Sequence, residues 1–133
     1  RISATDVNYW RGKFTGKNGL HSFNDLMTPA VQECVIRDLL RHNWQRLCSE
    51  IQARGLSLTD ILAKTWPDPS EPGRDIACTV SGLLASAHLR GVYGVMALVE
   101  NDKTSVDEIG TSILRYMADF GGYELSGICE ANA

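Results

Sequence analysis

The sequence predicts an all-α fold with one long core helix and several shorter helices. Between residues 28 and 53, apolar side chains recur at spacings of three and four, the period of a helix that buries one face. Between residues 79 and 99, the chain carries a single charged residue, Arg90, and small residues alternate with large apolar ones. No stretch has a pattern that supports a β-sheet of any size. These two segments are therefore expected to form the core.

The segment 79–99, TVSGLLASAHLRGVYGVMALV, is expected to form two packed helices. The first helix is expected to start near Thr79 or Ser81, either of which can cap it. Arg90-Gly91 suits its end, because cations favour the carbonyl end of a helix and glycine ends helices readily. The small side chains of the first helix can let another backbone approach closely.

The break between these helices places His88, Arg90 and Tyr93 near one elbow, where a site is expected first. The alternative for His88 is a purely structural role, since a lone histidine in an apolar stretch is often a hydrogen-bonded core residue. The other histidines, His21 and His42, are expected to be exposed.

Residues 1–27 are expected to be irregular, because three glycines in the run WRGKFTGKNG mark successive turns. Trp10 and Phe14 are large aromatic residues in this glycine-rich stretch. They can pack on a core as lids, or they can stack on the apolar face of a sugar ring, with Asn18 among the nearby hydrogen-bonding groups. Both interpretations remain open.

The helical core is expected to span residues 28–133, within a single domain of residues 1–133. Thr28-Pro29 predicts the start of the long helix, because a capping hydroxyl precedes a proline at the first helical position. The later elements are expected to be a helix at 59–64, a proline-rich loop at 66–73, a polar loop at 100–110, and a helix at 111–120 with Ile113, Leu114 and Met117 inward. Tyr123 and Leu125 are expected to pack back on the core.

The composition is that of an ordinary globular domain, with 44% hydrophobic residues, 22% charged residues and a net charge of -3. This balance gives no electrostatic case for binding nucleic acid or an anionic membrane. We expect no membrane span and no signal peptide, since the apolar runs look too short. The chain opens on Arg1, so we expect a processed product or a piece of a longer protein.

Four cysteines, Cys34, Cys48, Cys78 and Cys129, occur without any C-x-x-C motif, so no metal site and no cofactor are expected. Cys34 and Cys48 would lie about 21 Å apart on one helix, too far for a disulfide. Any disulfide is therefore expected to join that helix to Cys78 or Cys129, and four reduced thiols are the alternative.

No carboxylate is placed convincingly for acid–base catalysis. A general acid needs a dry pocket that keeps it protonated. Glu33 instead lies near the start of a helix, where the helix dipole lowers the pKa of a carboxyl. The remaining candidates lie near helix ends or in loops. Ser81 and Ser86 lie near His88, but neither serine belongs to a G-x-S-x-G elbow.

Three segments in order resemble the lysozyme-like peptidoglycan hydrolase domain of phage tail proteins and of contractile (type VI) secretion effectors. SGLLASAHLRGVYGV is similar to the family's S-G-L-L-A-A-A-H-L-x-G-x-G-G-V, and GTSILRYMADFGGYEL to its G-T-S-x-x-x-Y-M-x-K-F-G-G-Y-D-L. Upstream, WRGKFTGKNG and the PAVQE helix start resemble a W-x-G-x-W-T-G-K-x-G pattern followed by P-A-x-Q-E. Tyr93 departs from the family's G-x-G-G turn by adding bulk.

The resemblance implies a muramidase that degrades bacterial cell wall, secreted or delivered to the periplasm or cell wall of a target bacterium. Its implied partners are peptidoglycan glycan strands, and a cognate immunity protein or an upstream segment of the same gene product. The family's catalytic glutamate is expected upstream, beside a G-x-Y-Q-like motif, so no catalytic residue is assigned in this chain. The implied substrate-binding residues are Trp10, Phe14, Asn18, His88, Tyr93 and Tyr116.

The resemblance bears on two of these assignments in particular. LASAHLRG is remotely similar to the A-Y-N-A-G motif of lytic transglycosylases, which makes His88 substrate-facing, and Tyr116 resembles a tyrosine of the family's last helix. A non-catalytic module of the same fold that binds glycan or a protein is the main alternative. A plain helical interaction domain is the third.

Overall fold

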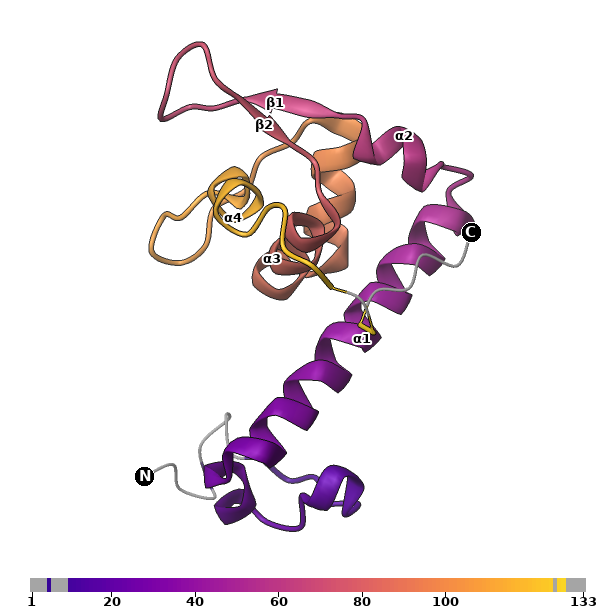
Figure 1. The fold of residues 1–133 in the computed structure, drawn as a ribbon, viewed down its shortest axis with the longest axis vertical. Coiled ribbons are helices and arrows are strands. Elements are labelled where there is room, and N and C mark those ends of the chain that lie inside the picture. Colours follow the sequence, from indigo (N-terminus) through magenta and orange to yellow (C-terminus); the bar gives the residue numbers. More distant parts are fainter. Residues whose placement is uncertain (1–4, 6–9, 126, 129–133) are drawn as a thin grey trace. The chain divides into compact units, whose positions relative to one another are not determined.

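The computed structural model describes residue 5, residues 10–125 and residues 127–128 (Figure 1). The described chain is mostly helical, with one long helix and several shorter ones, as the sequence predicts. Its elements are η1 (Lys17–Gly19), η2 (Phe23–Met27), α1 (Pro29–Ala53), α2 (Leu58–Leu62), β1 (Thr65–Pro67), β2 (Asp75–Ala77), α3 (Val80–Asn101) and α4 (Ile113–Asp119). The helices η1 and η2 are short 3-10 turns.

Two compact units divide the chain, Arg1–Arg37 and Asp38–Ala133. The first unit holds η1, η2 and the first turns of α1. The second holds the rest of α1 and all later elements described by the structure. The candidate pockets lie within the second unit.

The long helix α1 begins and ends where its sequence predicts. The Thr28 carbonyl accepts the Gln32 N–H at 3.0 Å, so the hydrogen bonds of the helix begin just before Pro29. After Ala53 the chain turns at Gly55, whose φ of +68° lies in the left-handed region that glycine adopts easily.

Only the later part of α1 enters the core of the second unit. Trp44, Leu47 and Ile51 are buried there. The apolar pattern also includes Ile36 and Leu39, but these side chains are 42% and 40% exposed. The pattern therefore overstates the buried length of the helix, because its buried residues all lie in its second half.

α3 is one helix with a break at the predicted glycine. Gly91 has φ 71° and ψ 169°, a non-helical conformation between two helical segments. The Thr79 hydroxyl accepts the Gly82 N–H at 3.0 Å and caps the first segment, as predicted. The second segment extends to Asn101, slightly beyond the predicted end.

α4 packs against α3 and supplies the other side of the core. Ile113, Leu114 and Met117 are buried, which confirms their predicted inward orientation. Ser112 caps the helix by accepting the Leu114 N–H at 3.2 Å. Leu125, after the helix, packs on the core as predicted. The prediction for Tyr123 is wrong, because its side chain is 66% exposed and only its backbone N–H reaches the core, donating to Ser81 Oγ.

A two-stranded antiparallel ribbon occupies part of the segment predicted to be a loop. β1 pairs with β2 in a register that places Trp66 opposite Ile76, and both side chains are buried. Strands of three residues are too short to display a recognisable alternation, so they could not be predicted from the apolar pattern. Trp66 also donates its indole N–H to Asp102 Oδ1 at 2.9 Å, which ties the ribbon to the end of α3.

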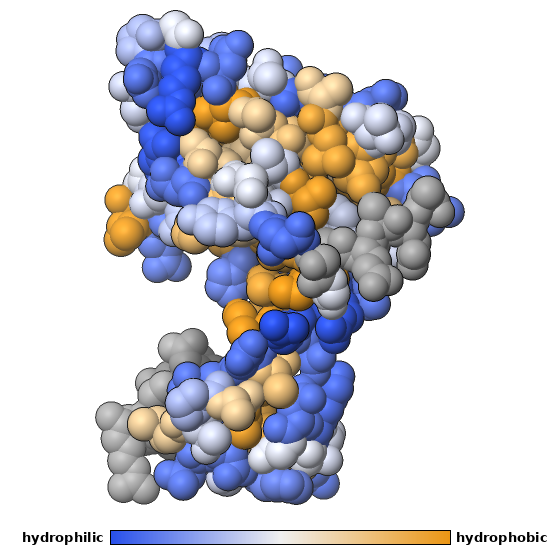
Figure 2. All heavy atoms as spheres, viewed as in Figure 1, coloured by the Kyte–Doolittle hydropathy of each residue, from blue (hydrophilic) through white to orange (hydrophobic). Residues whose placement is uncertain are grey.

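By length and composition alone, α3 could span a membrane, which corrects the expectation that no run approaches that length. However, 56% of its apolar window is buried inside the structure. A single such helix is weak support for a span, because the core helix of a globular domain passes the same test. On the drawn face of the second unit, apolar surface lies beside strongly hydrophilic patches (Figure 2).

Cys34, Cys48 and Cys78 are free thiols in the structure. Cys34 and Cys48 both lie on α1, as predicted, so they cannot pair with each other. Cys129 lies outside the described residues.

Candidate functional site

Two open pockets, each of about 320 Å³, lie at the break in α3. Val92 and Tyr93 line one pocket, and Leu89 and Arg90 line the other. Gly91 stands between these pairs, so its non-helical conformation sets how the flanking side chains diverge. The elbow predicted from the sequence therefore does border surface hollows.

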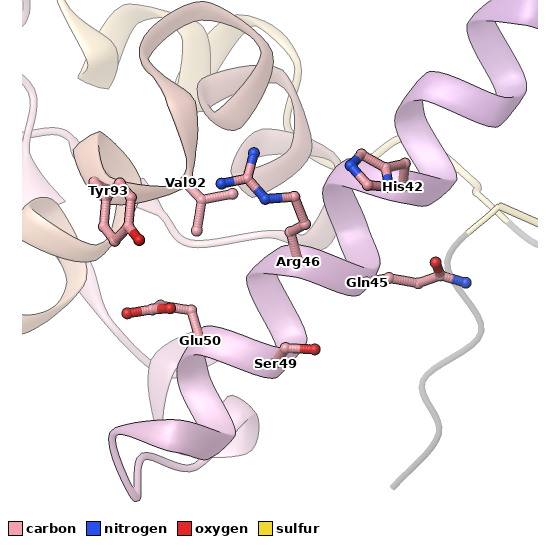
Figure 3. A pocket seen from close by; sticks show the side chains of 7 residues that line it. All are labelled: His42, Gln45, Arg46, Ser49, Glu50, Val92 and Tyr93. Atoms are coloured by element: carbon pink, nitrogen blue, oxygen red, sulfur yellow. The ribbon is translucent and has the colours of Figure 1, made fainter.

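We call the first hollow the His42–Tyr93 pocket. Its α1 side consists of His42, Gln45, Arg46, Ser49 and Glu50, and its α3 side of Val92 and Tyr93. In Figure 3, Arg46 and Glu50 project from α1 on the side of Val92 and Tyr93, whereas Gln45 and Ser49 point away from them. His42, Arg46 and Glu50 are spaced four apart, so successive turns of α1 align them on one face.

Glu50 is held by an ion pair at the edge of the pocket. Arg54 Nε donates to Glu50 Oε1 at 2.9 Å, and Arg54 Nη1 also bonds to Glu100 near the end of α3. Hydrogen bonds from Arg54 to Glu100 and then to Glu50 raise the pKa of the Arg54 guanidinium. This bridge joins the last turns of α1 and α3 and gives Glu50 a charged partner.

The second hollow, the Arg90 pocket, lies between α3 and the loop before α4. Its remaining lining residues are Asp107, Glu108 and Ile109. Arg90 Nε donates to Ser105 Oγ at 3.1 Å, so the guanidinium is engaged. Asp107 Oδ1 accepts the N–H groups of Ile109 and Thr111 at 3.0 and 2.7 Å, a role that fixes the loop.

Of the predicted substrate-binding residues in the second unit, Tyr93 lines the His42–Tyr93 pocket and is 66% exposed. His88 is exposed, not enclosed in the core, and it lines neither of the two pockets. Tyr116 is half-buried on α4, with its ring stacked on Phe120 at a centroid distance of 5.9 Å. Of these three residues, only Tyr93 therefore lines either of the two pockets.

In the first unit, Trp10 and Phe14 form a ring cluster with Phe23. The centroid distances are 4.6 Å for Trp10–Phe14, 5.2 Å for Trp10–Phe23 and 5.1 Å for Phe14–Phe23. The rings thus pack on one another, while Trp10 keeps 46% of its surface exposed. Asn18 is exposed and adopts φ 60°, a left-handed conformation within η1.

Sequence reasoning missed His42, Arg46 and Glu50 as pocket residues. The signal available was their spacing of four along one helix, but the same spacing describes any solvated helix face. Only the position of Val92 and Tyr93 opposite that face distinguishes the two cases, and it depends on how α3 packs.

Two carboxyl groups, those of Asp68 and Asp25, are engaged by backbone N–H groups. Asp68 is buried, and its Oδ1 accepts the Ser70 N–H at 2.8 Å in the turn between β1 and β2. Backbone hydrogen bonds, chiefly from the His21 N–H, lower the pKa of Asp25, the opposite of what a general acid needs.

Neither metal-ligating side chains nor comparisons with known proteins assign a function to these pockets. Within the part of the chain that the structure describes, no group of three or more His, Cys, Asp or Glu side chains is placed to hold a metal ion. Comparison of the chain with family models, with curated proteins and with solved structures found no match.

Proposed function

We propose that this chain is a lysozyme-like domain directed at the glycan strands of bacterial peptidoglycan. The observation that carries the proposal is the break at Gly91, which lies inside one of the segments that resemble the family and has an open pocket beside it. An exposed tyrosine ring next to hydrogen-bonding side chains is a common arrangement for holding a sugar. The lysozyme-like fold itself belongs to this proposal.

The proposed sugar contacts are those that the resemblance implies. Tyr93 is the best supported, since its ring is exposed within a pocket. His88 and Tyr116 are further contacts of the second unit. Trp10, Phe14 and Asn18 are proposed contacts of the first unit, where the exposed part of Trp10 remains open to a ligand.

Hydrolysis of the β-1,4 bond is proposed for the chain when it is joined to the segment that carries the family's glutamate. A glycosidase acid requires a raised pKa, and the buried Asp68 is engaged in a turn. We therefore expect the described residues to bind glycan without cleaving it. Delivery to the wall of a target bacterium, as an antibacterial effector or part of a phage lysin with a cognate immunity protein, belongs to the same proposal.

Binding is tested by cosedimentation of the 133-residue chain with insoluble peptidoglycan. We expect the wild-type chain to pellet with the wall and Tyr93→Ala to pellet less. Tyr123→Ala is the matched control, because Tyr123 is also 66% exposed but does not line the pocket. Equal losses for both variants would count against a site at Tyr93, and an unbound wild-type chain would overturn the proposed function.

Cleavage is tested by the turbidity of a peptidoglycan suspension. We expect the intact gene product to clear it and the isolated chain to leave it turbid. Clearing by the isolated chain would mean that an acid lies within these residues, contrary to the assignment above.

The alternative is a non-catalytic glycan-binding module of the same fold. It is favoured by the ion-paired state of Glu50, the carboxylate that lines the His42–Tyr93 pocket. Binding by the intact gene product without any clearing would select it. If the chain does not bind peptidoglycan at all, the remaining interpretation is a plain helical interaction domain.

A further inference from the structure

The His42–Tyr93 pocket contains one cation whose charge is not used by the fold. The side chains of Arg46 and His42 have no hydrogen bond or ion pair within the described residues. Glu50 lies four residues after Arg46 and could have paired with it, but Glu50 pairs instead with Arg54. The Arg46 guanidinium is therefore available to a ligand.

The neighbours of Arg46 define what kind of ligand fits. The guanidinium projects on the side of Val92 and the exposed Tyr93 ring (Figure 3). A guanidinium presents a planar fork of N–H donors that matches the two oxygens of a carboxylate. Glu50 also faces the pocket and would repel an anion, but its ion pair with Arg54 offsets part of that charge.

We propose that the His42–Tyr93 pocket binds a carboxylate group of peptidoglycan, with Arg46 as the principal contact. This inference rests on the proposed function and names the part of the wall polymer that the pocket recognises. His42 supplies a second donor on the same helix face, and the Tyr93 ring covers the apolar part of the ligand. A volume of about 320 Å³ suits one sugar or a short peptide group.

Two sources in peptidoglycan carry this chemistry. Glycan strands stripped of their peptides expose the lactyl carboxylate of each muramic acid, whereas the stem peptides carry carboxylates of their own. Both are therefore used as probes, together with insoluble wall and with wall whose carboxylates have been converted to amides.

The central variant is Arg46→Gln, which removes the charge and the fork from an exposed side chain. We expect it to weaken binding to insoluble wall about tenfold or more, the effect of losing a charge-assisted hydrogen bond. Arg46→Lys keeps the charge without the fork, so we expect an intermediate loss. Arg37→Gln is the matched control. It removes the same charge from α1 nine residues earlier, on roughly the opposite face of the helix. We expect this variant to bind like the wild type.

A second comparison uses wall whose carboxylates have been converted to amides. We expect amidation to weaken the wild type and to have little further effect on Arg46→Gln, because both changes remove the same contact. Weaker binding by wild type to stripped glycan strands than to stem peptides assigns the peptide source, and the reverse assigns the lactyl group.

The failure of this inference is distinct from the failure of the proposed function. If wall binds equally to wild type and Arg46→Gln, or if amidation weakens both by the same factor, the carboxylate site is overturned while wall binding stands. If the wild-type chain does not bind wall, the proposed function falls and the inference falls with it.

Discussion

Gly82 of α3 and Met117 of α4 lie so close that a single methyl group would not fit between them. A β-carbon built on Gly82 would stand 2.4 Å from Met117 Sδ and 2.9 Å from the Met117 carbonyl oxygen. The sulfur atom can move, but the carbonyl belongs to the backbone of α4. The absence of a side chain at Gly82 therefore sets how closely the two helices approach.

Replacing Gly82 by alanine is expected to destabilise the protein. Overpacking of a filled core costs about 1–3 kcal/mol. The helix propensity of alanine favours the variant by about 1 kcal/mol, so the net loss depends on the clash. Urea unfolding followed by circular dichroism measures it, and a more stable variant would show that α4 does not press on Gly82.

Gly91→Ala is expected to be destabilising for a different reason. Nothing lies within 4 Å of a β-carbon at Gly91, so the variant meets no steric neighbour. Its φ of 71° and ψ of 169° belong to a region that essentially only glycine occupies, and forcing alanine there costs about 1–3 kcal/mol.

The alternative outcome for Gly91→Ala is equally measurable. If α3 could straighten, alanine would gain helix propensity, and both the unfolding free energy and the helical circular dichroism signal would rise. The break would then be a feature that the rest of the fold does not require. Loss of both signals supports a break that is built into the core.

The sequence predicted most helices because their signals are local. A capping hydroxyl before Pro29 and a glycine after Arg90 act on the residues beside them, so the ends of α1 and the break in α3 could be placed without knowing the fold. The ribbon of β1 and β2 depends instead on a partner strand and on Asp102, which lies 36 residues from Trp66. Such a contact leaves no periodic trace in three residues.

The candidate site was predictable only in part. The elbow at Gly91 follows from local signals, because a glycine and a preceding cation mark the break, but the exposure of Tyr93 does not. The contribution of α1 could not be predicted, because Arg46 and Glu50 look like members of any solvated helix face. Their roles depend on Val92 and Tyr93 of α3, which line the same pocket, and these contacts are tertiary.

Asp102 is expected to stabilise the fold through the indole of Trp66. Trp66 is only 4% exposed and donates its N–H to Asp102 Oδ1 at 2.9 Å. Asp102→Ala removes the acceptor and leaves a buried donor unpaired, which costs about 1–3 kcal/mol. Thermal unfolding and the fluorescence of the tryptophans report the change.

Two further variants separate the hydrogen bond from the backbone conformation of Asp102, whose φ is 55°. Asp102→Asn keeps an acceptor and tolerates the left-handed region, so we expect a stability near that of the wild type. Asp102→Gly relieves the backbone but lacks the acceptor, so it should fall between alanine and asparagine. A glycine variant as stable as wild type would assign the whole effect to backbone strain.

Cys78 is expected to resist alkylation while Cys34 reacts. Burial raises the pKa of the Cys78 thiol to about 12, so the reactive thiolate is scarce at pH 8. Cys34 is exposed on α1. Peptide mapping after treatment with iodoacetamide should find Cys34 modified in the native protein and Cys78 modified only in denaturant. Rapid native modification of Cys78 would mean that its surroundings open readily.

The raised pKa of Cys78 also predicts how the stability of the protein depends on pH. The pKa of Cys78 is higher in the folded chain, at about 12, than its ordinary value of 9.0, so the folded state keeps a proton that the unfolded state loses. The contribution of Cys78 is therefore complete below about pH 9 and is lost as the pH rises toward 12.

Cys78→Ala lowers stability at neutral pH by removing buried volume, but between pH 9 and 12 its unfolding free energy should fall less steeply than that of the wild type. Cys34→Ala is the control, and its slope should match the wild type. Identical slopes for all three proteins would contradict a buried, protonated thiol at Cys78.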